Sequence, residues 1–314
     1  MKALVTGAGG FAGSHLCELL AERQGGPIDG TLFQASEAGG TPAVRPQLCD
    51  VTDRAAVTRL LEAVRPTEIF HLAAPSHVGE SFDHPAEAVA AIATGTICLL
   101  EAAAHLDPPP RVLLVGSAEV YGWSGISGEP LDEAAPLEPH SPYGVGKLAA
   151  EAYARLLSRR GLPIVTVRPF NHLGPRQSDR FAAAAFARQI AEAEAGRRPP
   201  LVEVGTLSAE RDFSDVRDVV RGYVVALERG ESGKVYNVAS GRAVRISELL
   251  ERLVGLSKIR IEVREDPARV RPVDLPRLVG DASRLRALGW RPEIPLARTL
   301  ADTLDWWRGR VAGG

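Results

Sequence analysis

A tyrosine and a lysine in the first half of the chain have the types and spacing that proton transfer requires. Tyr143 and Lys147 stand four residues apart in the segment YGVGK, at the start of a predicted helix, so their side chains share one face. An ammonium near a phenol favours the phenolate, so we expect Lys147 to lower the pKa of Tyr143 from about 10. The pair predicts an acid–base centre that works at neutral pH.

Ser117 is the third residue of this group. It follows the predicted strand 111–115 and Gly116. Because ligands of open α/β sheets bind beyond the carboxyl ends of the strands, Ser117 stands where a substrate oxygen is expected. Alone, Tyr-x-x-x-Lys is a common pattern and Ser117 an ordinary loop serine. A glycine-rich segment in the same chain favours the catalytic interpretation.

That segment, TGAGGFAG, lies between the first predicted strand and the first predicted helix. Two registers fit it. Gly7, Gly9 and Ala12 match the dinucleotide fingerprint, and Gly7, Gly10 and Gly13 match the three-residue spacing of short-chain dehydrogenases. In both, backbone N–H groups and a positive helix end approach a pyrophosphate where a Cβ would interfere. The strand before and the helix after favour a dinucleotide site over a plain tight turn.

The choice of nicotinamide cofactor is less clear. The carboxylate expected about 20 residues further on to hold a ribose hydroxyl has no clear candidate, because Asp29 comes early and Glu37 late. No Lys or Arg occurs between Arg23 and Arg45 to bind a 2′-phosphate. The sequence mildly favours NAD(H) over NADP(H).

Short apolar strands and helices position these residues. Strands are expected at 2–6, 31–34, 44–49, 68–71, 111–115 and 164–168, and helices at 11–23, 53–64, 85–105 and 142–160. Their alternation predicts a parallel sheet covered on both faces, a doubly wound α/β domain. After residue 169 helices are expected at 181–195 and 215–228, and strands at 235–238 and 259–263, with further amphipathic helices from 247.

Composition excludes several classes of protein. The 314 residues are 45% hydrophobic and 24% charged, which rules out disorder and a disulfide miniprotein. A formal net charge of −2 gives no support to nucleic-acid binding. The chain starts at once with a strand and its longest uncharged apolar stretch, 88–100, is too short to span a bilayer, so we expect a cytoplasmic protein.

The cysteines and histidines do not have the spacing of metal ligands. Cys17, Cys49 and Cys98 lie far apart in apolar contexts and are interpreted as reduced core thiols. His71, His77 and His84 fall on a strand, in a loop and at a helix start, so no metal site is expected.

Taken together, these segments resemble the extended short-chain dehydrogenase/reductases that act on nucleotide sugars. The resemblance runs from residue 4 to about 307 and rests on TGAGGFAG at 6–13, HLAAPSHVGESF at 71–82, GSAEVYG at 116–122, SPYGVGK at 141–147, RPFNHLGP at 168–175, RDFSDVRD at 211–218, VYNVASG at 235–241 and RPVDLPRLVGD at 271–281. Within the group, the later segments look most like the GDP-4-dehydro-6-deoxy-D-mannose reductases, whose near relatives are the GDP-mannose 4,6-dehydratases.

The resemblance implies a role for each residue. Tyr143 is the acid/base on the sugar oxygen, Lys147 tunes it and holds the nicotinamide ribose, and Ser117 hydrogen-bonds the same oxygen. Substrate contacts are expected from Ser76, Ser117, Asn171, Arg211 and Arg271, the arginines on phosphates or ribose unless they form surface salt bridges. Ser81 is a weaker candidate. Cofactor contacts are expected from Gly7, Gly10, Phe11, Ala12, Gly13, Asp50, Val51, Leu72, Ala73, Ala74, Val115, Tyr143, Lys147 and Pro169.

Glu119 leaves more than one reaction open. Sugar 4,6-dehydratases carry a glutamate at this place as the base for the C5 proton, but Ala118 stands where many of them have Asp or Ser. We favour NAD(P)H-dependent reduction of a GDP-linked C4 ketone to GDP-6-deoxy-D-mannose (GDP-D-rhamnose), with Glu119 kept as a catalytic candidate. Dehydration and 4-epimerisation are the alternatives, and a non-catalytic dinucleotide-binding regulator is the remote one.

The motif map also predicts the domains and the assembly. A Rossmann domain is expected from residues 1–172 and about 215–243, and a smaller interleaved substrate-binding α/β domain from 173–214 and 244–314. In the family, the helices expected at 85–105 and 142–160 pack into a four-helix interface, so the resemblance implies a homodimer. Packing against the chain's own sheet accounts for one apolar face of each helix.

Overall fold

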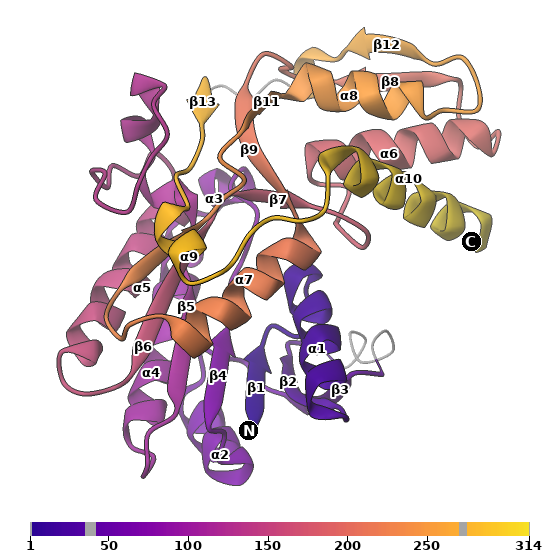
Figure 1. Cartoon of the computed structure of the whole chain (residues 1–314). Coiled ribbons are helices and arrows are strands. Elements are labelled where there is room, and N and C mark those ends of the chain that lie inside the picture. Colours follow the sequence, from indigo (N-terminus) through magenta and orange to yellow (C-terminus); the bar gives the residue numbers. More distant parts are fainter. Residues whose placement is uncertain (1, 35–41, 270–274, 314) are drawn as a thin grey trace.

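The computed structural model describes residues 2–34, 42–269 and 275–313. A seven-stranded sheet forms its centre, with the order β10-β6-β5-β4-β1-β2-β3 and parallel pairing throughout (Figure 1). The strands are β1 (Ala3–Thr6), β2 (Ile28–Leu32), β3 (Val44–Leu48), β4 (Glu68–His71), β5 (Arg111–Val115), β6 (Ile164–Pro169) and β10 (Val235–Val238). The predicted doubly wound α/β fold is confirmed.

The helices cover both faces of this sheet because residues along each strand alternate between two cores. Val5 and Phe70 point into a core shared with α1 (Phe11–Gln24) and α7 (Val216–Arg229). Leu4 and Ile69, their chain neighbours, point into the opposite core. That core is shared with α2 (Arg54–Val64), α4 (Pro85–Ala104) and α5 (Pro142–Ser158). All five helices match expected ones to within a few residues.

A second group of elements lies at the carboxyl edge of the large sheet (Figure 1). Its strands are β7 (Asn171–Leu173), β8 (Leu201–Val204), β9 (Glu210–Asp215), β11 (Ala243–Arg245), β12 (Glu262–Glu265) and β13 (Arg277–Leu278), and its helices are α6 (Ala182–Glu194), α8 (Ile246–Gly255) and α10 (Leu296–Gly313). A third apolar core joins these helices to β8. Strand β9 is central, since it pairs with β7, β11 and β13.

Short elements complete the chain, namely α3 (Glu80–Asp83), α9 (Ser283–Ala287) and the 3₁₀ turns η2 (Ala118–Val120), η3 (Trp123–Ser127) and η4 (Pro267–Arg269). Leu285 of α9 and the buried Trp290 belong to the core of the large sheet, although they follow the second group in sequence. These residues lie within 244–314, the range expected to belong to the smaller domain, and the domain boundaries at 172, 215 and 243 stay a prediction.

Two predicted strands are displaced. The strand expected at 31–34 is β2, Ile28–Leu32, whose Gly30 stands where a Cβ would meet Ala8 and Val44 at 2.5 and 2.8 Å. The strand expected at 259–263 is β12, and β12 and β8 pair in parallel as a separate ribbon. The boundaries of both strands are hard to locate from the apolar pattern. Asp29 and Gly30 interrupt that pattern in β2, and all residues of β12 are exposed.

Candidate active site

The glycine turn after β1 forms the first wall of a cavity of about 1270 Å³. Gly7 has a φ of +72°, and a Cβ there would stand 3.0 Å from the backbone of Ala73. A Cβ on Gly13 would stand 2.0 Å from the Gly7 carbonyl oxygen. Gly10 caps α1 without a side-chain hydrogen bond, so the positive helix end faces the cavity without a side chain over it. This cradle fits a dinucleotide pyrophosphate.

Every described residue that was expected to contact the cofactor lines this one cavity. They are Gly7, Gly10, Phe11, Ala12, Gly13, Asp50, Val51, Leu72, Ala73, Ala74, Val115, Tyr143, Lys147 and Pro169. Asp50 also accepts hydrogen bonds from the backbone and hydroxyl of Thr52, both at 2.8 Å, so it closes a turn before α2 as well. The structure brings these residues together, and their individual roles stay predictions.

Asp29 is not placed to hold a ribose. It lies in the middle of β2 and is buried, and its carboxylate is bound by Arg45 at 3.1 Å and Gln47 at 3.2 Å. The carboxyl end of β2 is Leu32, three residues further on. The other candidate, Glu37, lies outside the described residues.

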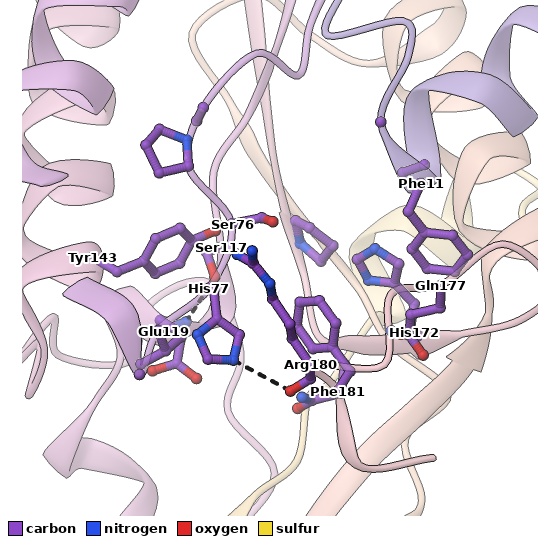
Figure 2. Close-up of a pocket in the computed structure, with 18 of the residues that line it drawn as sticks. Phe11, Ser76, His77, Ser117, Glu119, Tyr143, His172, Gln177, Arg180 and Phe181 are labelled. Carbon is purple, nitrogen blue, oxygen red and sulfur yellow. Dashed lines mark hydrogen bonds between the residues drawn. The ribbon is translucent and has the colours of Figure 1, made fainter. Parts of the chain in front are cut away.

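The catalytic candidates meet at the carboxyl end of β5. Ser117 follows that strand, and its Oγ accepts the N–H of Glu119 at 3.2 Å and shares a side-chain hydrogen bond with Tyr143. Figure 2 shows the Tyr143 ring pointing toward Ser117. Ser141 caps α5 by accepting the Gly144 N–H at 3.1 Å, which fixes the turn that carries Tyr143. Ser117 and Tyr143 therefore lie together, as the sequence grouped them, and their catalytic roles stay predictions.

Lys147 does not lower the pKa of Tyr143 as expected. Its Nζ donates to the Val115 carbonyl at 2.9 Å and lies 5.8 Å from the centre of the tyrosine ring. Burial raises the pKa of Tyr143 to about 12, against the Ser117 hydrogen bond, and the Glu119 charge adds to the rise. Burial lowers the pKa of Lys147 to about 8, although Glu151 opposes this. Desolvation is therefore the largest influence on the Tyr143 phenol, and it favours the protonated form.

Glu119 lines the cavity beside Tyr143 and near His140. Its Oε2 lies 3.7 Å from His140 Nδ1, and the His140 ring packs edge-on against Trp123 with centroids 5.6 Å apart. His140 also lines the cavity and is a residue that the sequence did not single out. A carboxylate therefore does stand at the reacting centre.

The substrate candidates divide into three groups. Ser76, Asn171 and Arg211 line the cavity, Asn171 from β7 and Arg211 from β9, where its Nη1 donates to the Glu210 carbonyl at 2.7 Å. Arg271 lies outside the described residues. Ser81 is buried and does not belong to the described cavity wall; its Oγ donates to the Val78 carbonyl and accepts the Tyr143 N–H, so it supports α5 instead.

The structure adds residues that no sequence pattern singled out. His172 stacks on Phe11 with centroids 5.7 Å apart, and Gln177 lies beside it, its Nε2 donating to the His172 carbonyl (Figure 2). His77, Arg180 and Phe181 also line the cavity and lie close together (Figure 2). The motif RPFNHLGP was a signal for His172. No spacing rule pointed to Arg180, because its neighbours come from a different part of the chain.

The part of the chain that the structure describes holds no group of three metal-ligating side chains. His71 is buried and neutral: Thr6 and Thr96 contact its two ring nitrogens at 2.8 and 3.2 Å, and burial lowers its pKa to about 3. The three cysteines are free and buried, as expected of core thiols.

Comparison with known proteins identifies the family. The family model for GDP-mannose 4,6 dehydratase matches residues 4–303. GDP-6-deoxy-D-mannose reductase from Pseudomonas aeruginosa is 35% identical to this chain, over 99% of the chain and 98% of the relative.

Solved structures show the same fold. RMD from Pseudomonas aeruginosa complexed with NADPH superposes with a TM-score of 0.84 at 33% identity, covering 99% of this chain and 100% of that one. UDP-glucose 4-epimerase from Thermus thermophilus complexed with NAD gives 0.86 at 29% identity, covering 98% and 99%. With the glycine cradle and the Ser117–Tyr143–Lys147 group in one cavity, these likenesses show that the chain belongs to the GDP-mannose 4,6-dehydratase family of extended short-chain dehydrogenase/reductases.

Proposed function

We propose that this protein reduces the C4 ketone of a GDP-linked 4-dehydro-6-deoxy-hexose to GDP-6-deoxy-D-mannose. The observation that carries the proposal is the meeting of Tyr143 and Ser117 at the carboxyl end of β5, in the same cavity as the glycine turn that fits a dinucleotide. A phenol in this position can give a proton to a ketone oxygen as the ketone is reduced. The likeness to the Pseudomonas aeruginosa reductase supports the same choice.

Ser117, Tyr143 and Lys147 have different roles in the proposed reduction. The nicotinamide cofactor, when bound in the glycine cradle, supplies the hydride that adds to C4. Ser117 donates a hydrogen bond to the ketone oxygen and keeps it near Tyr143. Tyr143 gives its proton to the developing alkoxide, and Lys147, whose Nζ is held at the Val115 carbonyl, contributes by binding the nicotinamide ribose.

The direct test is to incubate the protein separately with GDP-mannose and with GDP-4-dehydro-6-deoxy-D-mannose, each with NADH or NADPH, and to follow absorbance at the reduced-nicotinamide band together with the products. Oxidation of the cofactor with the keto sugar alone is expected. Conversion of GDP-mannose without net consumption of cofactor contradicts the proposal and identifies a dehydratase.

Glu119 supports dehydration as the second candidate function, because its carboxylate lines the cavity near Tyr143. A base in this position can take a proton from the carbon next to a ketone. If the protein is a dehydratase, Glu119→Gln abolishes the conversion of GDP-mannose. If it is a reductase, the same variant keeps most of its activity on the keto sugar.

For the cofactor we propose a preference for NAD(H). Thr31 and Phe33 line the cavity at the carboxyl end of β2, Arg45 is engaged by Asp29, and no Lys or Arg occurs between Arg23 and Arg45 in the sequence. A 2′-phosphate meets no cation from this stretch of chain. The kcat/KM for NADH should therefore exceed that for NADPH; the opposite order contradicts the preference.

We also propose that the protein is a homodimer built on α4 and α5. Exposed apolar residues of α5 recur at Val145, Ala149, Ala152 and Leu156, the spacing of a helix-packing seam. On α4, Ala86 and Ala90 are exposed and Ala93 and Ile97 are partly exposed, again at this spacing. The opposite faces of the two helices pack on the chain's own sheet, so these stripes can form a four-helix interface.

We place this activity in the cytoplasm. Among the described residues, one helix, α4 (Pro85–Ala104), is long and apolar enough to cross a membrane by composition, and half of that window is buried inside the protein. Packing against the sheet accounts for its apolar character. Fractionation of cells that produce the protein, with the activity found in the cytosol, tests the placement.

A further inference from the structure

One side of the cavity is closed by contacts between two segments about 100 residues apart. Arg180, just before α6, forms an ion pair with Glu80 of α3, with Nη1 and Oε1 2.5 Å apart. The Arg180 carbonyl accepts a hydrogen bond from His77 at 3.3 Å, and the His77 ring packs edge-on against Phe181 with centroids 5.6 Å apart. The cavity wall includes His77, Arg180 and Phe181. We call these three residues and Glu80 the bridge.

The hydrogen bonds of His77 define its tautomer and its part in the bridge. Its Nδ1 accepts the N–H of Glu80 at 3.1 Å, so Nε2 carries the proton that is donated to the Arg180 carbonyl. Figure 2 shows this bond as a dashed line, with the Arg180 side chain reaching from the side of Phe181 toward the loop that carries His77. The backbone of the bridge is therefore held by His77, independently of the Arg180 guanidinium.

The Arg180–Glu80 pair itself is exposed. The two side chains are 61% and 52% accessible, and ion pairs in such positions contribute little to stability because water solvates both partners. A guanidinium held by such a pair exchanges partners readily. A phosphate group offers Arg a bidentate, charge-assisted partner that is stronger than a solvated carboxylate.

Arg180 differs from the other cationic side chains in the described cavity wall, which are Lys147, Arg211 and Arg269. Lys147 and the nearly buried Arg211 each donate to a backbone carbonyl. Arg269 pairs with an aspartate of its own turn at 3.2 Å and lies 3.9 Å from a glutamate of β8, so both partners belong to the second group of elements. The ion pair between Arg180 and Glu80 differs from these, because it connects the segment before α6 to α3, which follows β4 in the chain.

We propose that Arg180 exchanges Glu80 for the diphosphate of the nucleotide sugar, so that Glu80 is a built-in competitor of the substrate. The proposal rests on the proposed function for its ligand class, a nucleoside diphosphate. Phe181 caps α6 without a side-chain hydrogen bond, so the positive end of that helix lies next to Arg180 and adds to the attraction for an anion. Arg180 is thereby a specificity-determining residue that acts on substrate binding.

Substitution of Arg180 and substitution of Glu80 are expected to change the Kd for GDP in opposite directions. Arg180→Gln removes the phosphate contact, so the Kd for GDP should rise about tenfold. Glu80→Gln removes the competitor while keeping the side chain's size, so the Kd for GDP should fall, by about threefold. The double variant should behave like Arg180→Gln alone, because Glu80 acts only through Arg180.

The experiment is calorimetric titration of GDP and UDP into the wild-type protein and these variants, at low and at moderate salt. Arg188→Gln is the matched control, since Arg188 lies on α6, pairs with Asp179 at 2.6 Å and is absent from the described cavity wall. The control should bind like the wild type. Steady-state kinetics with the keto sugar should show the Arg180→Gln effect in KM, with kcat within about twofold of the wild type.

Two results with the variants overturn the inference. If Arg180→Gln and Glu80→Gln weaken the binding of GDP equally, the pair is a structural bridge; if neither changes it, Arg180 does not contact the diphosphate. Failure of the proposed function is seen separately: the wild type then fails to reduce the keto sugar, although the opposite effects on nucleoside diphosphate binding persist. A wild type that binds neither GDP nor UDP contradicts both.

Discussion

At the scale of single residues, Tyr143 shows how tertiary environment changes the chemistry of a side chain. The spacing from Lys147 indicated an easily ionised phenol, but burial raises the pKa of Tyr143 to about 12 and Lys147 is bound to a backbone carbonyl. The phenol therefore keeps its proton until an alkoxide develops beside it.

Tyr143→Phe removes the proton donor and leaves the ring in place. We expect kcat for the keto sugar to fall about 100-fold or more, with the Kd of the reduced cofactor little changed, because the loss is confined to general acid catalysis. The control is Tyr153→Phe on the same helix, whose hydroxyl contacts Glu101 outside the described cavity wall. Full turnover by Tyr143→Phe contradicts the catalytic assignment.

His71 gives a prediction for stability against pH. Its folded-state pKa is lowered to about 3, whereas an unfolded histidine titrates near 6.5, so below pH 6.5 the unfolded chain binds a proton that the folded protein does not. Stability from this residue is present above pH 6.5 and is lost as the pH falls. Between pH 7 and pH 4 we expect a loss of about 3 kcal/mol.

The measurement is urea unfolding at several pH values for the wild type and His71→Gln. The variant cannot take up the proton, so its stability should fall less steeply between pH 6.5 and 4. Carboxylates contribute equally to both curves and cancel in the comparison. Parallel curves for the two proteins would refute the assignment.

At the scale of elements, the turn between β1 and α1 brings backbone segments so close together that a Cβ atom at Gly7 or Gly13 would collide with them. Gly7 requires the left-handed region, and the Gly13 position leaves no room for a Cβ against the Gly7 carbonyl. The turn, the start of α1 and the loop after β4 are packed together here. Any change at Gly13 must therefore move the cradle that faces the pyrophosphate.

Gly13→Ala places a methyl group 2.0 Å from the Gly7 oxygen, so the backbone has to shift. We expect a destabilisation of about 1–3 kcal/mol and at least tenfold weaker binding of the reduced cofactor, measured by thermal unfolding and by fluorescence titration. Gly26→Ala serves as the control, because a Cβ there meets nothing within 4 Å. Wild-type cofactor affinity in Gly13→Ala would show that the cradle is not used.

Contacts between elements also explain why the predicted position of one strand differs from the observed position. Strand β2 was expected three residues late because Asp29 and Gly30 are atypical of a buried strand. In the structure Asp29 is satisfied by Arg45 and Gln47 of β3, and Gly30 makes room for Ala8 and Val44. Both compensations come from neighbouring segments, which a local pattern cannot register.

At the scale of the whole molecule, the single chain leaves apolar stripes on α4 and α5 exposed. Leu156 is 42% exposed and Val145 45%, on a helix whose other face packs on the sheet. A second copy that supplies the same stripes would bury both in a symmetric four-helix contact. The active site lies at the start of α5, so the dimer would also stiffen the helix that carries Tyr143.

Leu156→Glu places a charge in the middle of the proposed contact. Because a carboxylate in an apolar interface is strongly unfavourable, we expect a dimeric wild type and a monomeric variant in sedimentation velocity runs at micromolar concentration. Arg159→Glu, at the exposed end of the same helix, controls for the change in charge. A wild type that sediments as a monomer contradicts the assembly.

Local sequence determined the parts of this protein that depend on neighbours along the chain: the glycine turn between strand and helix, the spacing of Tyr143 and Lys147, and the strands of the large sheet other than β2. These features follow from steric and periodic rules that act within a few residues.

Only the tertiary structure decided which distant groups meet. In the folded chain Asp29 binds Arg45, and the Ser81 hydroxyl accepts the Tyr143 N–H. Tyr143 is buried, which raises its pKa, and Arg180 forms an ion pair with Glu80. Desolvation and ion pairing depend on what surrounds a side chain in space, and segments a hundred residues apart supply those surroundings here.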